Sequence, residues 1–468
     1  MTVAHVPVTL AVSGKHHTQL MHHLFPGDGK EAVAIALCGR ASSDRRISLL
    51  VRDVLPIPYE ACRVRTPYRV TWSPNAMIPA LTRAMNEHLA VVKIHSHPNG
   101  YADFSETDDI SDRELFDSIY GWLGTDASQA SLIMLPGGKL IGRSIHPEGL
   151  GSPLDEIRVA GDEFQFWRSS EKNEDLPEHA TRIVQTFGEA TYQQLRSLRV
   201  GVVGCSGTGS VIVEQSARNC VGELVLVDPD IVELKNLNRI LNSTRNDADS
   251  GVAKTEVMRR AVGSMCLNTT VQAFNKDIFS PDVVHALSTC DVLFGCVDSI
   301  DGRHILNKLA TYYLIPYIDM GVRIDADPTG GVQQMCGVIH TLQPGGSSLM
   351  SRGLYNSQTL SDALMRRNDP VTYARREDEG YIRGARVDQP AVISLNMQVA
   401  ATAFNEFLAR LHPYRVDANS QFATRRIVLS DPAASVDEPE GESCATFSGN
   451  IGLGDQDPPL GMQGLREA

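Results

Sequence analysis

Residues 31–145 alternate between short apolar runs and longer amphipathic stretches. The apolar runs AVAIALCG, ISLLV, AVVKIHSH and ASLIMLP have the length and composition of buried β-strands. Between them, AMIPALTRAMNEHL and DISDRELFDSIYGWL carry apolar residues at helical spacing. This pattern predicts an α/β domain over residues 1–150.

A second α/β pattern begins near residue 198. The strand-like RVGVVG is followed by a glycine-rich turn, the helix-like SVIVEQSARNCVG and the strand-like ELVLVD, which is the order of a βαβ unit. We therefore predict a Rossmann-like domain over residues 181–430. Residues 151–180 are charged and suit a linker or helical connector, and residues 431–468, rich in Pro, Gly, Asp and Glu, suit an acidic irregular tail.

Composition narrows the class of protein. A chain of 468 residues exceeds one ordinary hydrophobic core, in agreement with two domains. The net charge of -13, without a long basic run, argues against nucleic acid as a partner. No apolar stretch of about 18 residues and no leader-like start are present, so we expect a cytoplasmic protein without a membrane partner. Nine cysteines without a CxxC pair indicate reduced thiols.

The stretch KIHSHPNGYADFSETDD, residues 93–109, contains a candidate metal site. His95 and His97 close an apolar strand, and the two-residue period of a strand directs both imidazoles to one face. A catalytic zinc takes three protein ligands, and Asp108 in the next helix can be the third. Glu31 is the candidate base, and Ser105 could donate to an oxyanion.

The same residues also admit a purely structural interpretation. SETD has the spacing of a capping box, with Ser105 as the N-cap and Asp108 as the third helical residue. In that case the two histidines would be incidental.

The complete string favours the metal site. HSHP, followed after six residues by SETD, resembles the signature of the JAMM (JAB/MPN-plus) metalloproteases, and the resemblance covers about residues 10–145. It implies that His95, His97 and Asp108 bind zinc, that Glu31 is the acid/base and that Ser105 assists the oxyanion. Members of this family cleave isopeptide or peptide bonds after the C-terminal glycine of ubiquitin-like proteins.

A second candidate site lies in GVVGCSGTGS. Gly204, Gly207 and Gly209 stand between a strand and a helix, where backbone amides can approach a phosphate. The next strand ends in Asp228, a position from which a carboxylate can bind ribose hydroxyls. The glycine order, GxxGxG, differs from the GxGxxG dinucleotide fingerprint, but these residues alone still allow a dehydrogenase.

The segments that follow indicate a different enzyme class. DPDIVELKNLNRI, GVAKTE and FGCVDSIDGR resemble, in this order, the motifs of the ThiF, MoeB and ubiquitin-activating adenylyltransferases. The resemblance implies that Asp228 binds ribose, that Arg239 and Lys254 bind ATP phosphates, and that Asn236 orients them. It also implies that Asp230 joins the same nucleotide site and that Asp298 holds Mg²⁺. ATRIVQTFG resembles the family's entry helix, whose arginine, here Arg182, reaches the partner's ATP site in a homodimer.

The chain departs from that family pattern at two places. Relatives often hold a structural zinc with two CxxC pairs, but the four positions here are Ser348, Ser351, Cys444 and Phe447, so we expect no zinc in this domain. The crossover segment, about residues 345–390, contains no cysteine for a thioester. Three routes stay open: direct transfer of the adenylate, a thiol in a mobile tail at Cys444, or a serine ester at Ser348 or Ser351. Cys336 lies on an apolar strand and is expected in the core.

Together the two motif sets predict a bifunctional enzyme of a bacterial ubiquitin-like conjugation system. Its adenylation domain would activate the C-terminal glycine of a β-grasp carrier with ATP and Mg²⁺, and its zinc peptidase would process or deconjugate that carrier. A conjugating enzyme is a possible further partner. Two alternatives stay open: activation of a sulfur carrier for thiocarboxylate formation, and a non-catalytic scaffold that binds the carrier.

Overall fold

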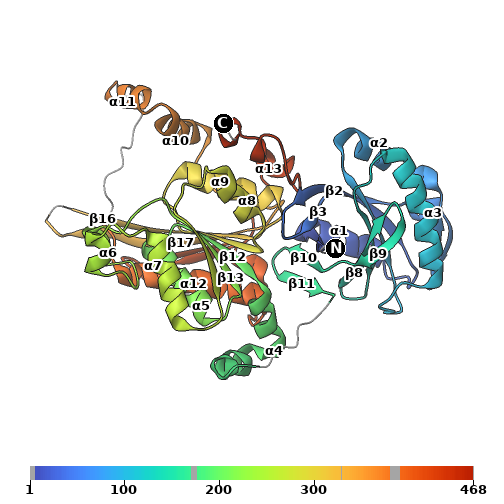
Figure 1. The fold of residues 1–468 in the computed structure, drawn as a ribbon, viewed down its shortest axis with the longest axis horizontal. Helices are drawn as coiled ribbons and strands as arrows, with labels where there is room; N and C mark the ends of the chain where they lie inside the picture. The colour runs from blue at the N-terminus through green and yellow to red at the C-terminus, as the bar shows by residue number, and fades with distance from the viewer. Residues whose placement is uncertain (1–5, 170–175, 328, 380–389, 467–468) are drawn as a thin grey trace, which may run out of the picture. The chain divides into compact units, whose positions relative to one another are not determined.

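The structure is a computed structural model that describes residues 6–169, 176–327, 329–379 and 390–466 (Figure 1). Two units divide the chain. The first comprises Met1–Asn173, Thr311–Leu314 and Asn450–Gln456, and the second comprises Glu174–Ala310, Ile315–Gly449 and Asp457–Ala468. Each unit is built on a large sheet with helices, so the predicted α/β class is confirmed for both.

The first unit contains a nine-stranded mixed sheet in the order β11-β10-β1-β3-β2-β6-β7-β8-β9. Its strands are β1 (Val8–Ser13), β2 (Val33–Ser42), β3 (Ile47–Pro56), β6 (Ala90–Ser96), β7 (Gln129–Met134), β8 (Leu140–His146), β9 (Gly149–Pro153), β10 (Glu156–Ala160) and β11 (Phe164–Arg168). A separate hairpin joins β4 (Cys62–Thr66) to β5 (Arg69–Trp72).

Three helices cover the two faces of this sheet. Leu20 and Leu24 of α1 (Gly14–Leu24) pack with Val92 and Ile94 of β6 in one core cluster. The other core cluster combines α2 (Ile78–Glu87) and α3 (Glu106–Leu123) with Val91 of β6. The alternation along β6 therefore assigns its odd-numbered side chains to the α3 face.

The connector predicted over residues 151–180 is wrong for residues 151–168. These residues contribute to β9, β10 and β11, where β10 pairs in parallel with β1 and β11 pairs antiparallel with β10. The strand was missed because its charged residues are typical of an exposed segment. Glu156 is nevertheless buried on β10, where it forms an ion pair with Arg168 of β11 at 2.5 Å.

The second unit contains an eight-stranded sheet in the order β14-β13-β12-β15-β16-β17-β18-β19. The first five strands in that order pair in parallel, and the last three continue antiparallel. Their bounds are β12 (Arg199–Val203), β13 (Glu223–Val227), β14 (Thr270–Phe274), β15 (Val292–Gly295), β16 (Tyr317–Ala326), β17 (Val332–Leu342), β18 (Thr424–Val428) and β19 (Val436–Glu438).

Helices lie on both faces of the second sheet (Figure 1). On one face lie α5 (Gly207–Arg218), α7 (Lys254–Met265) and α12 (Ile393–Leu411), and on the other α8 (Pro281–Ser288) and α9 (Ile300–Tyr312). The strand order reverses at β12, between β13 and β15. In such sheets ligands bind beside the carboxyl ends of the strands at this reversal.

The remaining elements of the second unit are shorter or more exposed. They are α4 (Thr181–Ser197), bent at Gly188, together with α6 (Arg245–Asp249), α10 (Ser357–Asn368), α11 (Pro370–Asp378) and α13 (Ala445–Ser448). Among the described residues, no helix is both long enough and apolar enough to cross a membrane.

The tail predicted over residues 431–468 is not wholly irregular. β19 pairs with β18, and Cys444, Phe447, Leu460 and Leu465 are buried. The segment is ordered by these few buried apolar side chains. Its average composition, acidic and rich in glycine, is instead typical of disordered sequence, which is why the prediction failed.

Candidate metal centre and nucleotide site

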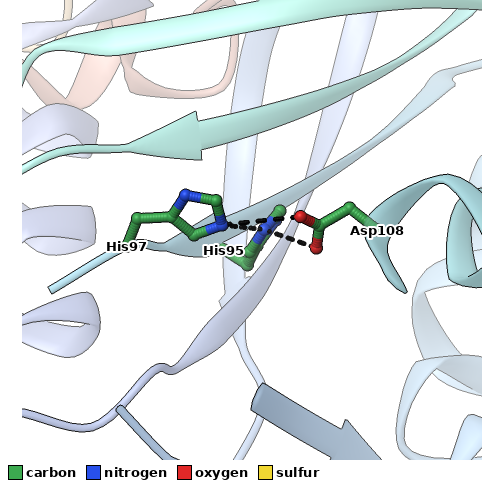
Figure 2. Close-up of side chains that lie close together, drawn as sticks. All are labelled: His95, His97 and Asp108. Carbon is green, nitrogen blue, oxygen red and sulfur yellow. Dashed lines mark hydrogen bonds and ion pairs between the residues drawn. The ribbon is translucent and has the colours of Figure 1, made fainter. Parts of the chain in front are cut away.

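The end of β6 and the first turn of α3 bring three metal-binding side chains together (Figure 2). His95 Nε2 lies 3.1 Å from His97 Nε2 and 3.1 Å from Asp108 Oδ1, and His97 Nε2 lies 3.6 Å from Asp108 Oδ2. Both histidines are buried and Asp108 is partly buried. In the described part of the chain, no other group of three or more such side chains converges in this way.

This geometry fits a zinc ion. Ligands about 2.0–2.1 Å from a tetrahedral zinc are separated from one another by roughly 3.3 Å, which is close to the three observed separations. His97 also has an outer partner, because its Nδ1 lies 2.8 Å from the carbonyl oxygen of Tyr101. Such a contact fixes the ring and directs Nε2 toward the metal position.

The charges of Asp108 and His95 suit a cation, whereas His97 would have to release a proton when a metal ion binds. Although burial alone would raise the pKa of Asp108, hydrogen bonds from His95 and His97 lower it well below the ordinary value. Burial lowers the pKa of His95 and keeps its imidazole neutral, as a metal ligand must be. For His97, burial is outweighed by hydrogen bonds to Asp108 and Tyr101, which raise the pKa.

Glu31 lies opposite His97. Val33 of β2 pairs with His95 of β6, and two hydrogen bonds join Ala32 to Ser96, so the antiparallel register places residue 31 across from residue 97. Burial raises the pKa of Glu31 to about 7; His97 opposes this rise and Asp108 adds to it. A carboxyl group with this pKa can accept and release a proton near neutral pH.

Ser105 and Asp108 do form the capping box that the alternative interpretation predicted. Asp108 Oδ2 accepts from the Ser105 amide at 2.8 Å and from the Ser105 hydroxyl at 2.7 Å. Asp108 Oδ1 faces His95. The cap and the metal centre are therefore compatible, because one carboxylate serves both and the cap fixes its orientation.

Sequence reasoning missed a buried charge network beside the metal centre. Asp112 of α3 accepts from Lys93 of β6 at 2.6 Å and from Arg143 of β8 at 2.7 Å. Arg143 also donates to Asp109 at 2.5 Å. The available signal was the lysine inside the apolar run AVVKIHSH, since a buried lysine requires a carboxylate partner.

The candidate nucleotide residues gather at the carboxyl ends of β12, β13 and β15. Gly204 follows β12, Asp228 follows β13 and Asp298 lies three residues beyond β15. The Asp228 carboxylate accepts from the amides of Cys205 and Asp230 at 2.7 and 2.9 Å. Burial raises the pKa of Asp228, whereas Lys254 opposes the rise.

Close contacts explain the absence of a side chain at each of the three glycines. Gly204 has a φ of +91°, and a Cβ on Gly209 would lie 1.7 Å from the Gly204 carbonyl oxygen. A Cβ on Gly207 would lie 2.3 Å from Asn396 of α12. Gly207 is thus explained by helix packing, whereas Gly204 and Gly209 shape the turn itself.

The basic residues of this site have separate partners. Lys254 is buried and lies 2.7 Å from Asp230 and 3.8 Å from Asp228. Arg239 donates to the Lys235 carbonyl at 2.9 Å, and Asn236, which is buried, accepts from the Glu233 amide at 3.1 Å.

The two remaining predicted residues are exposed. Arg182 donates to Gln185 of its own helix α4 at 3.0 Å. The carboxylate of Asp298 acts electrostatically on Arg303 of α9. The structure therefore brings Gly204, Asp228, Asp230 and Lys254 together, while the across-dimer role of Arg182 stays a prediction.

The positions at which the family resemblance implies a structural zinc are closed by other contacts. The Ser348 amide donates to Ser351 Oγ at 2.9 Å, and the Ser351 amide donates to Ser348 Oγ at 3.1 Å. Cys336 lies in the core as expected. Cys444 is also buried, and its amide donates to the Gly346 carbonyl at 3.0 Å, so a thiol in a mobile tail is not what the structure contains. Residues 380–389 of the crossover segment lie outside the described residues.

Comparison with known proteins identifies the class. The model of the ThiF family matches residues 179–431, which is more than half of the chain, and the model of prokaryotic homologs of the JAB domain matches residues 13–138. The chain belongs to the ThiF family and carries a JAB-like domain ahead of its ThiF domain. The predicted fusion is confirmed.

Curated relatives include an E1-like ubiquitin-activating enzyme and ubiquitin-like modifier-activating enzymes. An E1-like ubiquitin-activating enzyme of Saccharomyces cerevisiae is 28% identical over 30% of this chain and 22% of its own length. Ubiquitin-like modifier-activating enzyme 5 of Bombyx mori is 27% identical over 34% of this chain and 40% of its own length. The chain therefore spans less than half of either relative. The crystal structure of E. coli MccB with ATP has a TM-score of 0.43 at 17% identity, covering 58% of this chain and 74% of that chain.

Proposed function

We propose that this protein activates a ubiquitin-like carrier with ATP in its second unit and cleaves after the same carrier's C-terminal glycine in its first unit. The peptidase half is supported chiefly by one observation, the convergence of His95, His97 and Asp108 within 4.8 Å. The adenylation half is supported by membership in the ThiF family and by the gathering of its motif residues at the strand reversal.

In the peptidase unit, His95, His97 and Asp108 would hold the metal. A zinc ion bound there would lower the pKa of a water molecule and polarise the scissile carbonyl group. Glu31 would take up the proton from that water and deliver it to the leaving amine, a role that its pKa of about 7 suits. Ser105 would stabilise the oxyanion only if its hydroxyl hydrogen turned away from Asp108, to which it now donates.

In the adenylation unit, the glycine turn and the α5 N-terminus would face the ATP phosphates, and Asp228 would bind the ribose. Attack of a carboxylate on the α-phosphate brings two anions together, so cationic groups must neutralise them. Lys254 and Arg239 would neutralise the phosphates, and Asp298 would hold Mg²⁺. Lys254 would then exchange its contact with Asp230 for the nucleotide.

Two assays test the proposal. The first uses a β-grasp protein that ends in glycine, extended beyond that glycine by a short peptide; the zinc-loaded enzyme is expected to release that peptide. The second follows the same carrier, ending in glycine, by intact mass with Mg-ATP; a carrier adenylate is expected. No cleavage with full zinc occupancy would refute the peptidase half, and no ATP–pyrophosphate exchange with the carrier would refute the adenylation half.

The mass measurement also separates the routes of transfer. An enzyme–carrier adduct that resists thiol reductant would indicate a serine ester, whereas a reductant-sensitive adduct would indicate a thiol. Conversion of the carrier terminus to a thiocarboxylate in the presence of a sulfur donor would favour the sulfur-carrier function instead.

A further inference from the structure

A row of polar side chains on β6 faces α3. Lys93 and His95 of β6, and His97 one residue beyond its end, follow the two-residue period of the strand and therefore share one face, the face on which Val91 contacts the α2 and α3 cluster. Across from them, Asp112 meets Lys93 and Asp108 meets His95. The metal centre, drawn in Figure 2, and the Lys93–Asp112 ion pair are thus neighbouring contacts between the same strand and the same helix.

The spacing of the two contacts matches. Two residues along a strand span about 6.6 Å, and four residues along a helix span about 6 Å. A helix held with Asp112 on Lys93 therefore has Asp108 one turn earlier, opposite His95. A shift of α3 by a single residue would move Asp108 about 1.5 Å along the axis and rotate it by roughly 100° away from the histidines.

Arg143 fixes the same helix from a second strand. It lies on β8, donates to Asp112 and Asp109, and places its guanidinium 3.9 Å from the centre of the Phe104 ring, just before the helix begins. The exposed fractions are 4% for Lys93, 0% for Asp112 and 8% for Arg143. Two cations and two carboxylates make the network neutral.

Such a network is poorly explained by stability alone. Replacing buried ion pairs with apolar side chains is often neutral or stabilising, and their best-attested use is to specify one register. We propose that Lys93, Asp112 and Arg143 are positioning residues that fix the register of α3 on β6 and thereby hold Asp108 at ligand distance from the two histidines. This inference rests on the metal centre of the proposed function.

The test measures metal affinity, not activity. Zinc dissociation constants are measured on the full chain by competition with a chromophoric chelator, and the Co²⁺ absorption spectrum reports ligand geometry. Asp112→Asn is expected to weaken zinc binding by about 10–100-fold, as outer-shell substitutions do, and to alter the Co²⁺ bands. The matched control is Glu156→Gln, which breaks a buried ion pair with Arg168. Glu156 lies on β10, four strands away from β6 in the same sheet. The control is expected to lower thermal stability and leave zinc affinity unchanged.

The outcomes distinguish a network that positions Asp108 from one that only stabilises the fold. If Asp112→Asn lowers thermal stability as the control does but binds zinc within twofold of the wild type, the network is structural and the inference is overturned. If Asp112→Asn does not fold, Asp109→Asn, which removes one partly exposed carboxylate from Arg143, is expected to weaken zinc binding by a few-fold, and an unchanged constant would overturn the inference. If His97→Ala binds zinc as the wild type does, the metal centre itself is wrong and the proposed peptidase fails first.

Discussion

The two candidate sites are assembled in different ways. The metal centre takes its three donors from residues 95–108, one strand end and the helix that follows, and they contact one another directly. The nucleotide site draws on residues 204–298, spread over three strands and the segments after them, and its basic residues contact separate partners. The first site is fixed by local spacing and a capping box, whereas the second depends on the order of strands in a parallel sheet.

This difference has a chemical consequence. A metal site must be preorganised, because a small ion demands ligands at fixed separations. A site for a triphosphate and a protein terminus can rely on exposed residues that exchange partners when the ligand arrives. Substitutions at the first site should therefore abolish binding outright, and substitutions at the second should act mainly on the rate of adenylation.

Asp108→Ala is expected to have the largest effect. It removes a ligand and the N-terminal cap together, so zinc content should fall from one per chain to near zero and cleavage to background. ATP–pyrophosphate exchange should persist, since the nucleotide residues belong to the other unit. The control is Glu106→Ala, an exposed acid in the same helical turn, which should retain zinc. Zinc retained by Asp108→Ala would contradict the ligand assignment.

Lys254→Ala should produce the reciprocal result. Loss of a buried cation at the phosphates should reduce ATP–pyrophosphate exchange by about 10²–10³-fold, the range for removing one electrostatic stabiliser of a transition state. Peptide release and zinc content should not change. Lys276→Ala, an exposed lysine paired with Asp282, serves as the control. If Lys254→Ala slowed both reactions equally, the two sites would not be independent.

Glu31→Gln should make the metal-free protein more stable at alkaline pH while impairing cleavage. The pKa of Glu31 is about 7 in the folded chain, above the ordinary value of 4.5 for a glutamate, so between these two pH values the folded state binds a proton that the unfolded state has lost. The contribution of Glu31 to the free energy of unfolding therefore falls as the pH rises from about 4.5 to 7. Above pH 7 the full cost of burying the ionised carboxylate is present. Glutamine carries no charge at any pH, so the variant does not have this cost.

Calorimetry of the chelator-treated full chain tests whether Glu31→Gln stabilises or destabilises the protein at alkaline pH. Glu31→Gln should melt roughly 6–12 °C above the wild type at pH 8 and together with it at pH 4, because a pKa raised from 4.5 to about 7 corresponds to about 3 kcal/mol and each kcal/mol to about 2–4 °C for a unit of this size. Glu163→Gln, at an exposed position, should show no pH-dependent difference. A Glu31→Gln variant less stable than wild type at pH 8 would show that the carboxylate is stabilised there.

The sequence predicted much of this architecture, for identifiable reasons. His95, His97 and Asp108 could be placed because strand and helix periods convert fixed spacing into a shared face. Gly204 and Asp228 could be placed because each directly follows a strand, and Lys254 could be placed because the family resemblance assigns its motif to the same site. The Lys93–Asp112–Arg143 network could not, since Arg143 comes from a strand whose distance from β6 is set only by the sheet. β10 was missed because its buried charges imitate a solvated segment.

Ser351→Ala should have the smallest effect and test the region where the resemblance implies a second zinc. Its hydroxyl accepts from the Ser348 amide, and losing one such hydrogen bond costs about 1 kcal/mol, or roughly 2–4 °C in melting temperature. The control Ser264→Ala removes an exposed hydroxyl on α7 and should change less. Zinc content should stay at one per chain in both variants, because serine hydroxyls and one buried thiol make a poor set of zinc ligands. A second zinc in the wild type, lost from Ser351→Ala, would instead show that this turn binds metal. Both units would then contain a metal site.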